Sequence, residues 1–220
     1  MNYKYYPTPH GKRIYRFLHR IGHPLFKGLV NFEVKGQEYV PVASGGIMMS
    51  NHVSYLDPVF LGAAVPREFH SIARDDLFGV RFFGDLITYF NAIPIKRGKP
   101  DLKNLRNILS MLKEDKLLLM FPEGTRSVDG TLGEALEGAG FIAYRTNVPV
   151  IPVFLKGTEI ILPKHAKGIK RAKVSVRFGP AIELTELRNI RRARKAYKPI
   201  AQEIMKGIAT LKTSAENPLN

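Results

Sequence analysis

The amino-acid sequence predicts an α/β fold, a single domain in which helices flank a mixed, mostly parallel central sheet. Short apolar runs alternate along the chain with segments of helical periodicity, an order typical of sheets with βα connections. No internal repeat and no proline-, glycine- or serine-rich linker divides the chain. A length of 220 residues with 45% hydrophobic content is enough to bury one core without metals or disulfides.

The N-terminal segment, residues 1–30, is predicted to form an amphipathic helical anchor ahead of a domain spanning residues 31–220. Between Gly11 and Val30, apolar side chains recur at helical spacings while basic side chains occupy the other faces. Such a helix is typical of a membrane-surface anchor, and a helix packed on its own domain has the same pattern. Pro24 is expected to kink or end it.

Six apolar runs are predicted strands, and four segments of helical periodicity are predicted helices. The strands are Ile47 to Ser50, Phe69 to Ala73, Ala92 to Ile95, Leu117 to Phe121, Val148 to Leu155 and Lys173 to Phe178. The helices are Pro58 to Ala64, Leu77 to Phe90, Leu102 to Glu114 and Gly133 to Thr146. Helices between successive strands favour parallel or mixed pairing of those strands.

The C-terminal segment carries an apolar stripe at spacings of three and four residues, from Ile190 to Leu211. This spacing predicts a helical tail docked on the core, with Pro199 dividing it into two helices. The other faces hold the basic side chains Arg188, Arg191, Arg192, Arg194, Lys195 and Lys198. Such a run is typical of a solvated helix face, or of a surface for acidic lipid or nucleic acid.

Composition excludes several kinds of site. The chain has no cysteine, which excludes a disulfide framework, a thiolate nucleophile and a cysteine-ligated zinc site. Its formal net charge of +15 favours anionic partners such as acidic lipid headgroups, phosphorylated substrates or nucleic acid. No apolar run approaches the roughly 20 residues that cross a bilayer, and no signal-type stretch opens the chain. If the protein meets a membrane, we expect it to lie on the surface.

The first candidate motif follows the predicted strand Ile47 to Ser50 and includes His52 and Asp57. Histidine accepts a proton from an alcohol near neutral pH, and a carboxylate on its other ring nitrogen fixes the tautomer and stabilises the imidazolium. On one continuous helix, side chains five residues apart diverge by about 140°. A turn between the two is therefore needed, and Asp57 followed by Pro58 supplies it as the start of a helix. The alternative is that Asp57 only caps this helix and His52 is an ordinary buried histidine.

The second candidate motif, Phe121 to Ser127, follows the strand that begins at Leu117. Gly124 and the small hydroxyl side chains near it allow backbone amides to approach an anion. Arg126 can bind a phosphate or carboxylate through two N–H groups. Glu123 can form an ion pair with Arg126 or bind a substrate hydroxyl. An ordinary turn is the alternative.

Two further segments complete the set. Ala92 to Gly98 is a short apolar strand that ends in two cations, Lys96 and Arg97. Both can bind a phosphate group, and Arg97 is favoured because its guanidinium is a planar fork. In Val148 to Val153, two prolines disfavour a central strand unless a ligand or another edge lies alongside. We expect this last segment to be structural.

Taken in this order, the four segments resemble the motifs of the glycerolipid acyltransferase family, in particular 1-acylglycerol-3-phosphate acyltransferases of bacterial type. The resemblance runs from about Val30 to Phe178, with the motifs inside residues 47–153. Asn51, His52 and Asp57 match the first family motif. The other motifs are matched in full by Phe121 to Ser127 (third), and in outline by Ile93 to Arg97 (second) and Val148 to Pro152 (fourth).

The resemblance implies a glycerol-3-phosphate acyltransferase-like fold, with residues 31–220 as the acyltransferase domain. A fatty acyl group would pass from acyl-CoA or acyl carrier protein to the sn-2 hydroxyl of 1-acylglycerol-3-phosphate, giving phosphatidic acid. His52 would be the general base, and Asp57 would orient it. The glycerol phosphate would be held by Arg97, Glu123, Gly124, Thr125 and Arg126. No acyl-enzyme, cofactor or metal is expected, because the acceptor oxygen attacks the thioester directly.

The resemblance also implies partners and a location. We expect a lysophospholipid acceptor, an acyl thioester donor and an anionic membrane surface, and no nucleic acid. The protein would be peripheral or monotopic at the cytoplasmic face of the cell membrane, with residues 10–30 as the counterpart of the family's membrane anchor. Two positions depart from the family pattern. Leu136 stands where many relatives have a lysine, and Phe90 and Asn91 stand where a glycine commonly precedes the second motif.

Three alternatives remain open. The same chemistry can act on another acceptor, such as glycerol-3-phosphate, a lyso-aminolipid or another lysophospholipid, and Leu136 keeps this choice open. A basic nucleic-acid-binding protein without catalysis fits the charge, but no helix-turn-helix, zinc or RNP-type signature supports it. A serine hydrolase is disfavoured because neither Ser50 nor Ser54 lies in a nucleophile elbow.

Overall fold

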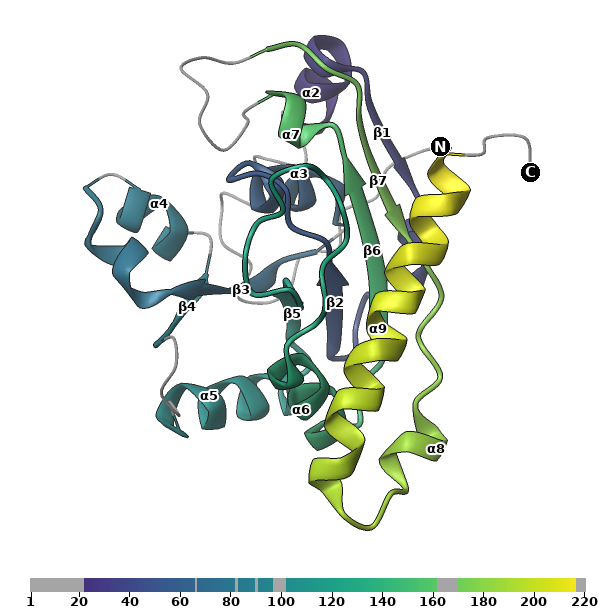
Figure 1. Ribbon diagram of the computed structural model, residues 1–220. Helices are drawn as coiled ribbons and strands as arrows, with labels where there is room; N and C mark the ends of the chain where they lie inside the picture. Colours follow the sequence, from purple (N-terminus) through teal and green to yellow (C-terminus); the bar gives the residue numbers. More distant parts are fainter. Residues whose placement is uncertain are drawn as a thin grey trace.

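Seven strands pair into one sheet within the residues that the structure describes, 22–65, 67–81, 83–89, 91–96, 102–161 and 170–216 (Figure 1). In this computed structural model the strand order is β1-β7-β6-β2-β5-β3-β4. The strands are β1 (Phe32–Lys35), β2 (Gly46–Ser50), β3 (Phe69–Arg74), β4 (Ala92–Ile95), β5 (Leu117–Met120), β6 (Val150–Lys156) and β7 (Val174–Phe178). Neighbours run parallel except β6 and β7, which are antiparallel. The predicted mixed, mostly parallel sheet is confirmed.

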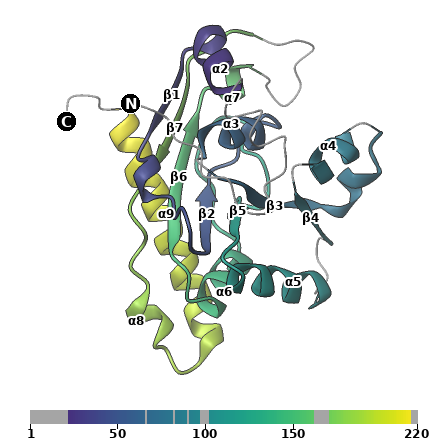
Figure 2. The same cartoon turned by 180° about the vertical axis from the view of Figure 1, so that it is seen from behind.

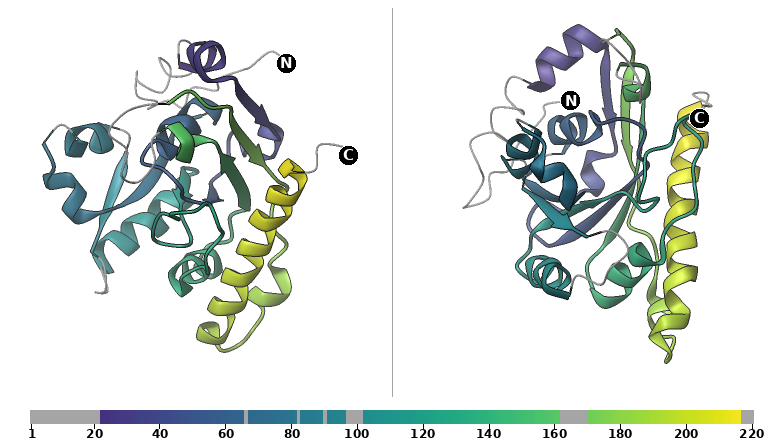
Figure 3. Two further views of the ribbon diagram at one scale, coloured as in Figure 1. Left: turned by 45° about the horizontal axis from the view of Figure 1, so that its top comes forward. Right: turned by 60° about the vertical axis from the view of Figure 1, so that its left-hand side comes forward.

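Helices cover both faces of the sheet. The α-helices are α2 (His23–Val30), α3 (Asp57–Ala64), α4 (Phe83–Tyr89), α5 (Leu102–Lys113), α6 (Glu137–Arg145), α7 (Thr158–Ile161), α8 (Thr185–Arg188) and α9 (Ala193–Glu216), with 3-10 turns η2 (Gln37–Tyr39) and η3 (Asp75–Gly79). α2 and α3 pack on one face, whereas α5, α6 and α9 pack on the other (Figures 1 and 2). In the right view of Figure 3, the purple α2 and the yellow α9 lie on opposite sides of the strands.

The central strands are apolar throughout because both of their faces are buried. In β2, Met48 belongs to the core under α3, whereas Ile47 and Met49 belong to the core under α5, α6 and α9. In β5, Leu117 and Leu118 divide in the same way. Successive strand side chains point to opposite faces, so a strand covered on both sides reads as a continuous apolar run.

β1 is absent from the predicted elements. It is a four-residue edge strand in which one side chain is buried and the last is exposed. This pattern is too short to separate from the preceding helix by sequence alone. Its position follows from pairing with β7, where Phe32 lies opposite Val174.

The helix predicted from Leu77 to Phe90 is wrong in part, because the chain forms η3 and then α4. Val80 adopts an extended conformation (φ −80°, ψ 117°), which ends η3. The chain then packs back closely, since a Cβ on Gly84 would lie 2.1 Å from the carbonyl oxygen of Phe78. The helix predicted from Gly133 also begins later, at Glu137, because the residues before it form a loop that contacts the motif after β5.

The predicted division of the C-terminal segment at Pro199 is wrong, since α9 continues through it. A proline inside a helix removes one hydrogen bond and costs about 3 kcal/mol. Ile200, Ile204 and Ile208 are each fully buried against the core. Burying one such side chain contributes roughly 1.5–3 kcal/mol, so packing offsets the proline.

The prolines around β6 do not exclude it from the centre of the sheet, contrary to expectation. β6 lies between β2 and β7. The carbonyls of Pro152 and Val150 accept hydrogen bonds from Gly179 (3.0 Å) and Ile182 (2.8 Å), residues that follow the end of β7. The missing N–H of Pro152 therefore faces an irregular segment rather than a strand ladder, where it would be disruptive.

The predicted N-terminal anchor lies mostly outside the described residues and stays a prediction. In the part that is described, Pro24 stands in the first turn of α2, and the predicted kink or helix end at Pro24 stays a prediction because the residues before Gly22 lie outside the described ranges. Phe26 packs on Phe60 of the core, with ring centroids 4.7 Å apart, while Leu25 is half-exposed. None of the helices within the described ranges combines the length and apolar character that crossing a bilayer requires.

Candidate active site

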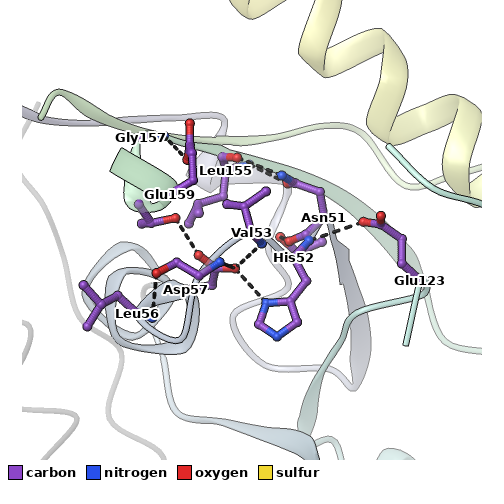
Figure 4. Close-up of polar contacts among 12 residues, drawn as sticks. Asn51, His52, Val53, Leu56, Asp57, Glu123, Leu155, Gly157 and Glu159 are labelled. Carbon is purple, nitrogen blue, oxygen red and sulfur yellow. Dashed lines mark hydrogen bonds and ion pairs between the residues drawn. The ribbon is translucent and has the colours of Figure 1, made fainter. Parts of the chain in front are cut away.

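The two main motifs meet at the carboxyl edge of the sheet. β2 and β5 are parallel neighbours, and Met49 lies opposite Met120 near their ends. The residues that follow each strand therefore emerge side by side, which places His52 next to the segment after β5 (Figure 4). In α/β sheets this edge is where ligands usually bind.

His52 is tied to Asp57 through one ring nitrogen. Its Nδ1 lies 2.7 Å from Oδ2 of Asp57, and its ring stacks on Phe121 with centroids 3.9 Å apart and planes at 15°. A carboxylate only accepts hydrogen bonds, so Nδ1 carries the hydrogen and Nε2 holds a free electron pair. Nε2 points away from Asp57 and bonds to no other described residue, and the side chain is 18% exposed (Figure 4). A histidine in this arrangement has a free ring nitrogen that can accept a proton.

Asp57 is completely buried and fully engaged by hydrogen bonds. Its Oδ2 accepts from the backbone N–H groups of Val53 (2.7 Å) and Ser54 (2.9 Å) as well as from His52. Its Oδ1 accepts from the hydroxyl of Thr158 at 2.5 Å. These donors solvate the buried carboxylate. Among the described residues, no N–H of α3 donates to it, so the alternative that Asp57 only caps this helix is wrong.

The turn that the motif required is present between His52 and Asp57. The N–H of Asp57 donates to the carbonyl of Ser54 at 3.3 Å, and α3 begins at Asp57 with Pro58 in its first turn. The turn is anchored from the other side by Asn51, whose side chain donates to and accepts from the backbone of Leu155, both at 2.8 Å. Asn51 thus joins the end of β2 to β6.

Glu123 binds backbone groups of the site rather than Arg126. Its Oε1 accepts from the N–H of His52 (3.3 Å) and its Oε2 from the N–H of Gly133 (2.9 Å). In addition, the N–H of Ser127 donates to the carbonyl of His52 at 2.8 Å. Glu123 therefore braces the His52 segment against the segment after β5, and its predicted contact with a substrate hydroxyl stays a prediction.

The rest of the second motif includes Arg126, and the residue after it, Ser127, bonds to the backbone of His52. Gly124 has φ +67°, a left-handed conformation that favours glycine, and a Cβ there would lie 2.4 Å from Cδ1 of Leu136. Thr125 is exposed. The guanidinium of Arg126 lies over the ring of Tyr55, 3.4 Å from its centroid. Its Nη1 is buried and has no hydrogen-bond partner among the described residues. A buried unpaired donor of this kind is suited to an anion.

The two cations predicted to bind phosphate after the strand Ala92 to Ile95 are Lys96 and Arg97. Arg97 lies outside the described residues, so its predicted phosphate contact stays a prediction. Lys96 is exposed directly after β4, at the same edge of the sheet as the motifs. Within the described ranges, no three carboxylate or imidazole groups converge as metal ligands.

Thr158 is the site residue that the sequence analysis missed. It is fully buried at the start of α7, 101 residues from Asp57 in the chain. Gly157 (φ +99°) allows the close approach that places it, since a Cβ there would lie 2.0 Å from the carbonyl oxygen of Lys173. The one available signal is its position just after a strand, at the edge where sites form.

We predict that Thr158→Val slows catalysis without weakening substrate binding. Valine has nearly the same shape but leaves Oδ1 of Asp57 without its described donor, a bond of the charged type that contributes about 1.5–3 kcal/mol. We expect kcat to fall roughly tenfold with KM unchanged, and Thr158→Ser to restore most of the rate. Steady-state kinetics of the three proteins decide this. A loss that Ser does not restore would show that Thr158 only packs.

The chain is similar to acyltransferases in sequence and in fold. A family model described as Acyltransferase matches residues 31–156. The chain is 29% identical over 169 residues to 1-acyl-sn-glycerol-3-phosphate acyltransferase LPAT1, chloroplastic, of Arabidopsis thaliana, covering 73% of this chain and 46% of that protein. It is 32% identical over 147 residues to the 1-acyl-sn-glycerol-3-phosphate acyltransferase of Streptococcus pneumoniae, covering 66% and 52%. The chain therefore spans about half the length of these relatives.

The fold has a counterpart among solved structures. The crystal structure of the 1-acyl-sn-glycerophosphate acyltransferase PlsC from Thermotoga maritima matches with a TM-score of 0.72 and 26% sequence identity. The match covers 90% of this chain and 80% of that one.

Proposed function

The chain belongs to the acyltransferase family, and we propose that it moves a fatty acyl group from acyl-CoA or acyl carrier protein to the sn-2 hydroxyl of 1-acylglycerol-3-phosphate, giving phosphatidic acid. The observation that carries this proposal is the pairing of His52 Nδ1 with the buried Asp57 at 2.7 Å. This pairing leaves Nε2 of His52 free to take a proton.

The proposed reaction is a direct transfer. The acceptor hydroxyl donates its proton to Nε2 of His52 as its oxygen attacks the carbonyl carbon of the thioester. The C–O bond forms, the C–S bond breaks, and the imidazolium returns the proton to the leaving thiolate. Asp57 stabilises the imidazolium while it exists.

An acyl-enzyme intermediate is not part of the proposal. A nucleophile needs a hydroxyl or thiol within hydrogen-bond reach of the base. The chain has no cysteine, and the hydroxyl of Ser50 donates to the carbonyl of Asn51 at 3.0 Å. The hydroxyl of Ser54 accepts from the N–H of Leu56 at 3.3 Å. These contacts also disfavour the serine hydrolase alternative.

The acceptor phosphate is assigned to the basic groups at the carboxyl edge of the sheet. Arg126 offers a buried unpaired donor there, and Lys96 follows β4, which is separated from β5 by β3. Arg97 is the next residue in the sequence. The names of the matched relatives refer to a phosphorylated acceptor, which agrees with this arrangement. Leu136, half-exposed beside Gly124, is an apolar neighbour of the same loop and keeps the choice of headgroup open to test.

A panel of acceptors tests the proposal. With labelled palmitoyl-CoA or palmitoyl-acyl carrier protein, we expect transfer to lysophosphatidic acid at a rate at least tenfold above lysophosphatidylethanolamine, glycerol-3-phosphate and monoacylglycerol. A preference for another lysolipid would keep the chemistry and change the acceptor. Absence of transfer to every acceptor with both donors would contradict the proposal.

We also propose that the protein acts at an anionic membrane surface, because its acceptor is a lipid and its net charge is +15. Liposome flotation without detergent tests this. Binding to anionic vesicles should weaken as salt is raised. Failure to float with anionic vesicles at low salt, or stronger retention by DNA, would count against it.

A further inference from the structure

We propose that Tyr55 is a positioning residue, a flat support that holds the guanidinium of Arg126 so that its free N–H edge faces the acceptor phosphate. This inference rests on the proposed function. It assigns a role to a residue that lies between His52 and Asp57 in the chain.

The contact itself is close and uses only the face of the guanidinium. The central carbon of Arg126 lies 3.4 Å from the centroid of the Tyr55 ring. The five N–H groups of arginine lie in the guanidinium plane, so stacking on an aromatic ring leaves them available. Nη1 is both buried and unpaired among the described residues, so at least one donor on that edge awaits a partner.

Tyr55 differs from the other residues of the turn in being exposed. Val53 is 5% exposed, Ser54 is fully buried, and Leu56 packs against the core. Tyr55 is 44% exposed, and Arg126 covers part of its ring. The core buries less of this side chain than of its neighbours in the turn, and the contact with Arg126 gives the exposed ring a role.

Hydrogen bonds fix the backbone on both sides of the contact between Tyr55 and Arg126. Asp57 fixes the backbone of the turn by accepting from Val53 and Ser54. The residue after Arg126 donates its N–H to the carbonyl of His52 at 2.8 Å. Tyr55 thus extends from the same turn that positions the base, and the distance between base and phosphate-binding cation is set by one local structure.

A second arginine at this edge is engaged differently. Arg74, the last residue of β3, pairs with Asp76, and this pairing raises the pKa of Arg74. Among the described residues, no carboxylate lies within 4.0 Å of the guanidinium of Arg126. The charge of Arg126 is therefore not balanced by a described carboxylate and is available to a ligand. The orientation of Arg126 consequently affects ligand binding more than that of Arg74 does.

Two variants of Tyr55 separate support of Arg126 from other roles. Tyr55→Phe keeps the aromatic face, and Tyr55→Leu removes it while keeping an apolar side chain. The matched control is Tyr39→Leu, a tyrosine that is 45% exposed in η2, before β2 and away from the carboxyl edge. We expect Tyr55→Leu to raise KM for lysophosphatidic acid about three- to tenfold with kcat within twofold of wild type. Tyr55→Phe and Tyr39→Leu should match wild type.

Binding in the absence of turnover makes the test independent of activity. In a His52→Ala background, the Kd of a short-chain, water-soluble lysophosphatidic acid should rise by the same factor in Tyr55→Leu and not in Tyr55→Phe. The Kd of the corresponding monoacylglycerol, which lacks the phosphate, should not change. This binding result separates a failure of the inference from a failure of the proposed catalysis.

Three results would overturn the inference. One is an equal effect of Tyr55→Leu on acceptors with and without phosphate. Another is a defect in Tyr55→Phe as large as that in Tyr55→Leu, which would assign the role to the hydroxyl. The third is an unchanged Kd for the phosphorylated ligand in Tyr55→Leu.

Discussion

Purified His52→Ala protein is expected to lose acyl transfer by a factor of roughly 100 to 10,000 while keeping its fold. In the proposed mechanism the imidazole takes the acceptor's proton through Nε2, which Asp57 leaves free, and general-base catalysis contributes about that factor. Because proton transfer occurs in the transition state, kcat and kcat/KM should fall together. The rate of phosphatidic acid formation measures the effect.

The fold of His52→Ala should survive because the ring is partly exposed and Asp57 keeps three other donors, from Val53, Ser54 and Thr158. The thermal midpoint and the circular dichroism spectrum provide the control. A folded variant that retains more than a tenth of the wild-type rate would remove His52 from its assigned role.

Asp57→Ala is expected to combine a comparable loss of activity with the largest loss of stability at the site. Truncation leaves two backbone N–H groups and the Thr158 hydroxyl buried without their acceptor. Each buried unsatisfied group costs about 1–3 kcal/mol. We therefore expect the free energy of unfolding to fall by about 3–5 kcal/mol, which lowers Tm by roughly 10 °C in a chain of this size. Chemical and thermal denaturation measure this.

Asp57→Asn separates charge from structure. An asparagine oxygen can accept from His52, Val53 and Ser54, while its amide N–H can donate to the hydroxyl of Thr158. Most of the stability should therefore return, whereas the imidazolium loses its neighbouring charge. A rate loss of roughly 100-fold or more is expected to remain. Wild-type activity in Asp57→Asn would show that the carboxylate charge is not used.

The elements that the sequence predicts well are those with long apolar runs or distinctive end residues. β2, β5 and β6 are buried on both faces, so their apolar runs identify them. Asp57 and Pro58 mark the start of α3 and hence the turn that joins base and carboxylate. These signals depend only on residues close together in the sequence, so they can be recognised without knowledge of the fold.

What the sequence does not predict depends on contacts between distant residues. Thr158 is 101 residues from Asp57, and Asn51 is 104 residues from the Leu155 backbone that it binds. From the sequence, the carboxylate of Glu123 could pair with Arg126 or bind a substrate hydroxyl. The fold shows that it accepts hydrogen bonds from the backbone N–H groups of His52 and Gly133. Pro199 by itself favours a break in the helix, whereas burial of the isoleucines of α9 against the core favours a continuous helix. The structure shows that the burial prevails.

The central claim is that the acceptor oxygen attacks the thioester directly with His52 as base, and intact-protein mass spectrometry during turnover tests it most directly. With palmitoyl-CoA or palmitoyl-acyl carrier protein alone, the protein should keep its unmodified mass. On addition of lysophosphatidic acid, phosphatidic acid should form with wild type and not with His52→Ala, still without an adduct. A palmitoylated protein that passes its acyl group to the acceptor at the rate of turnover would contradict the mechanism.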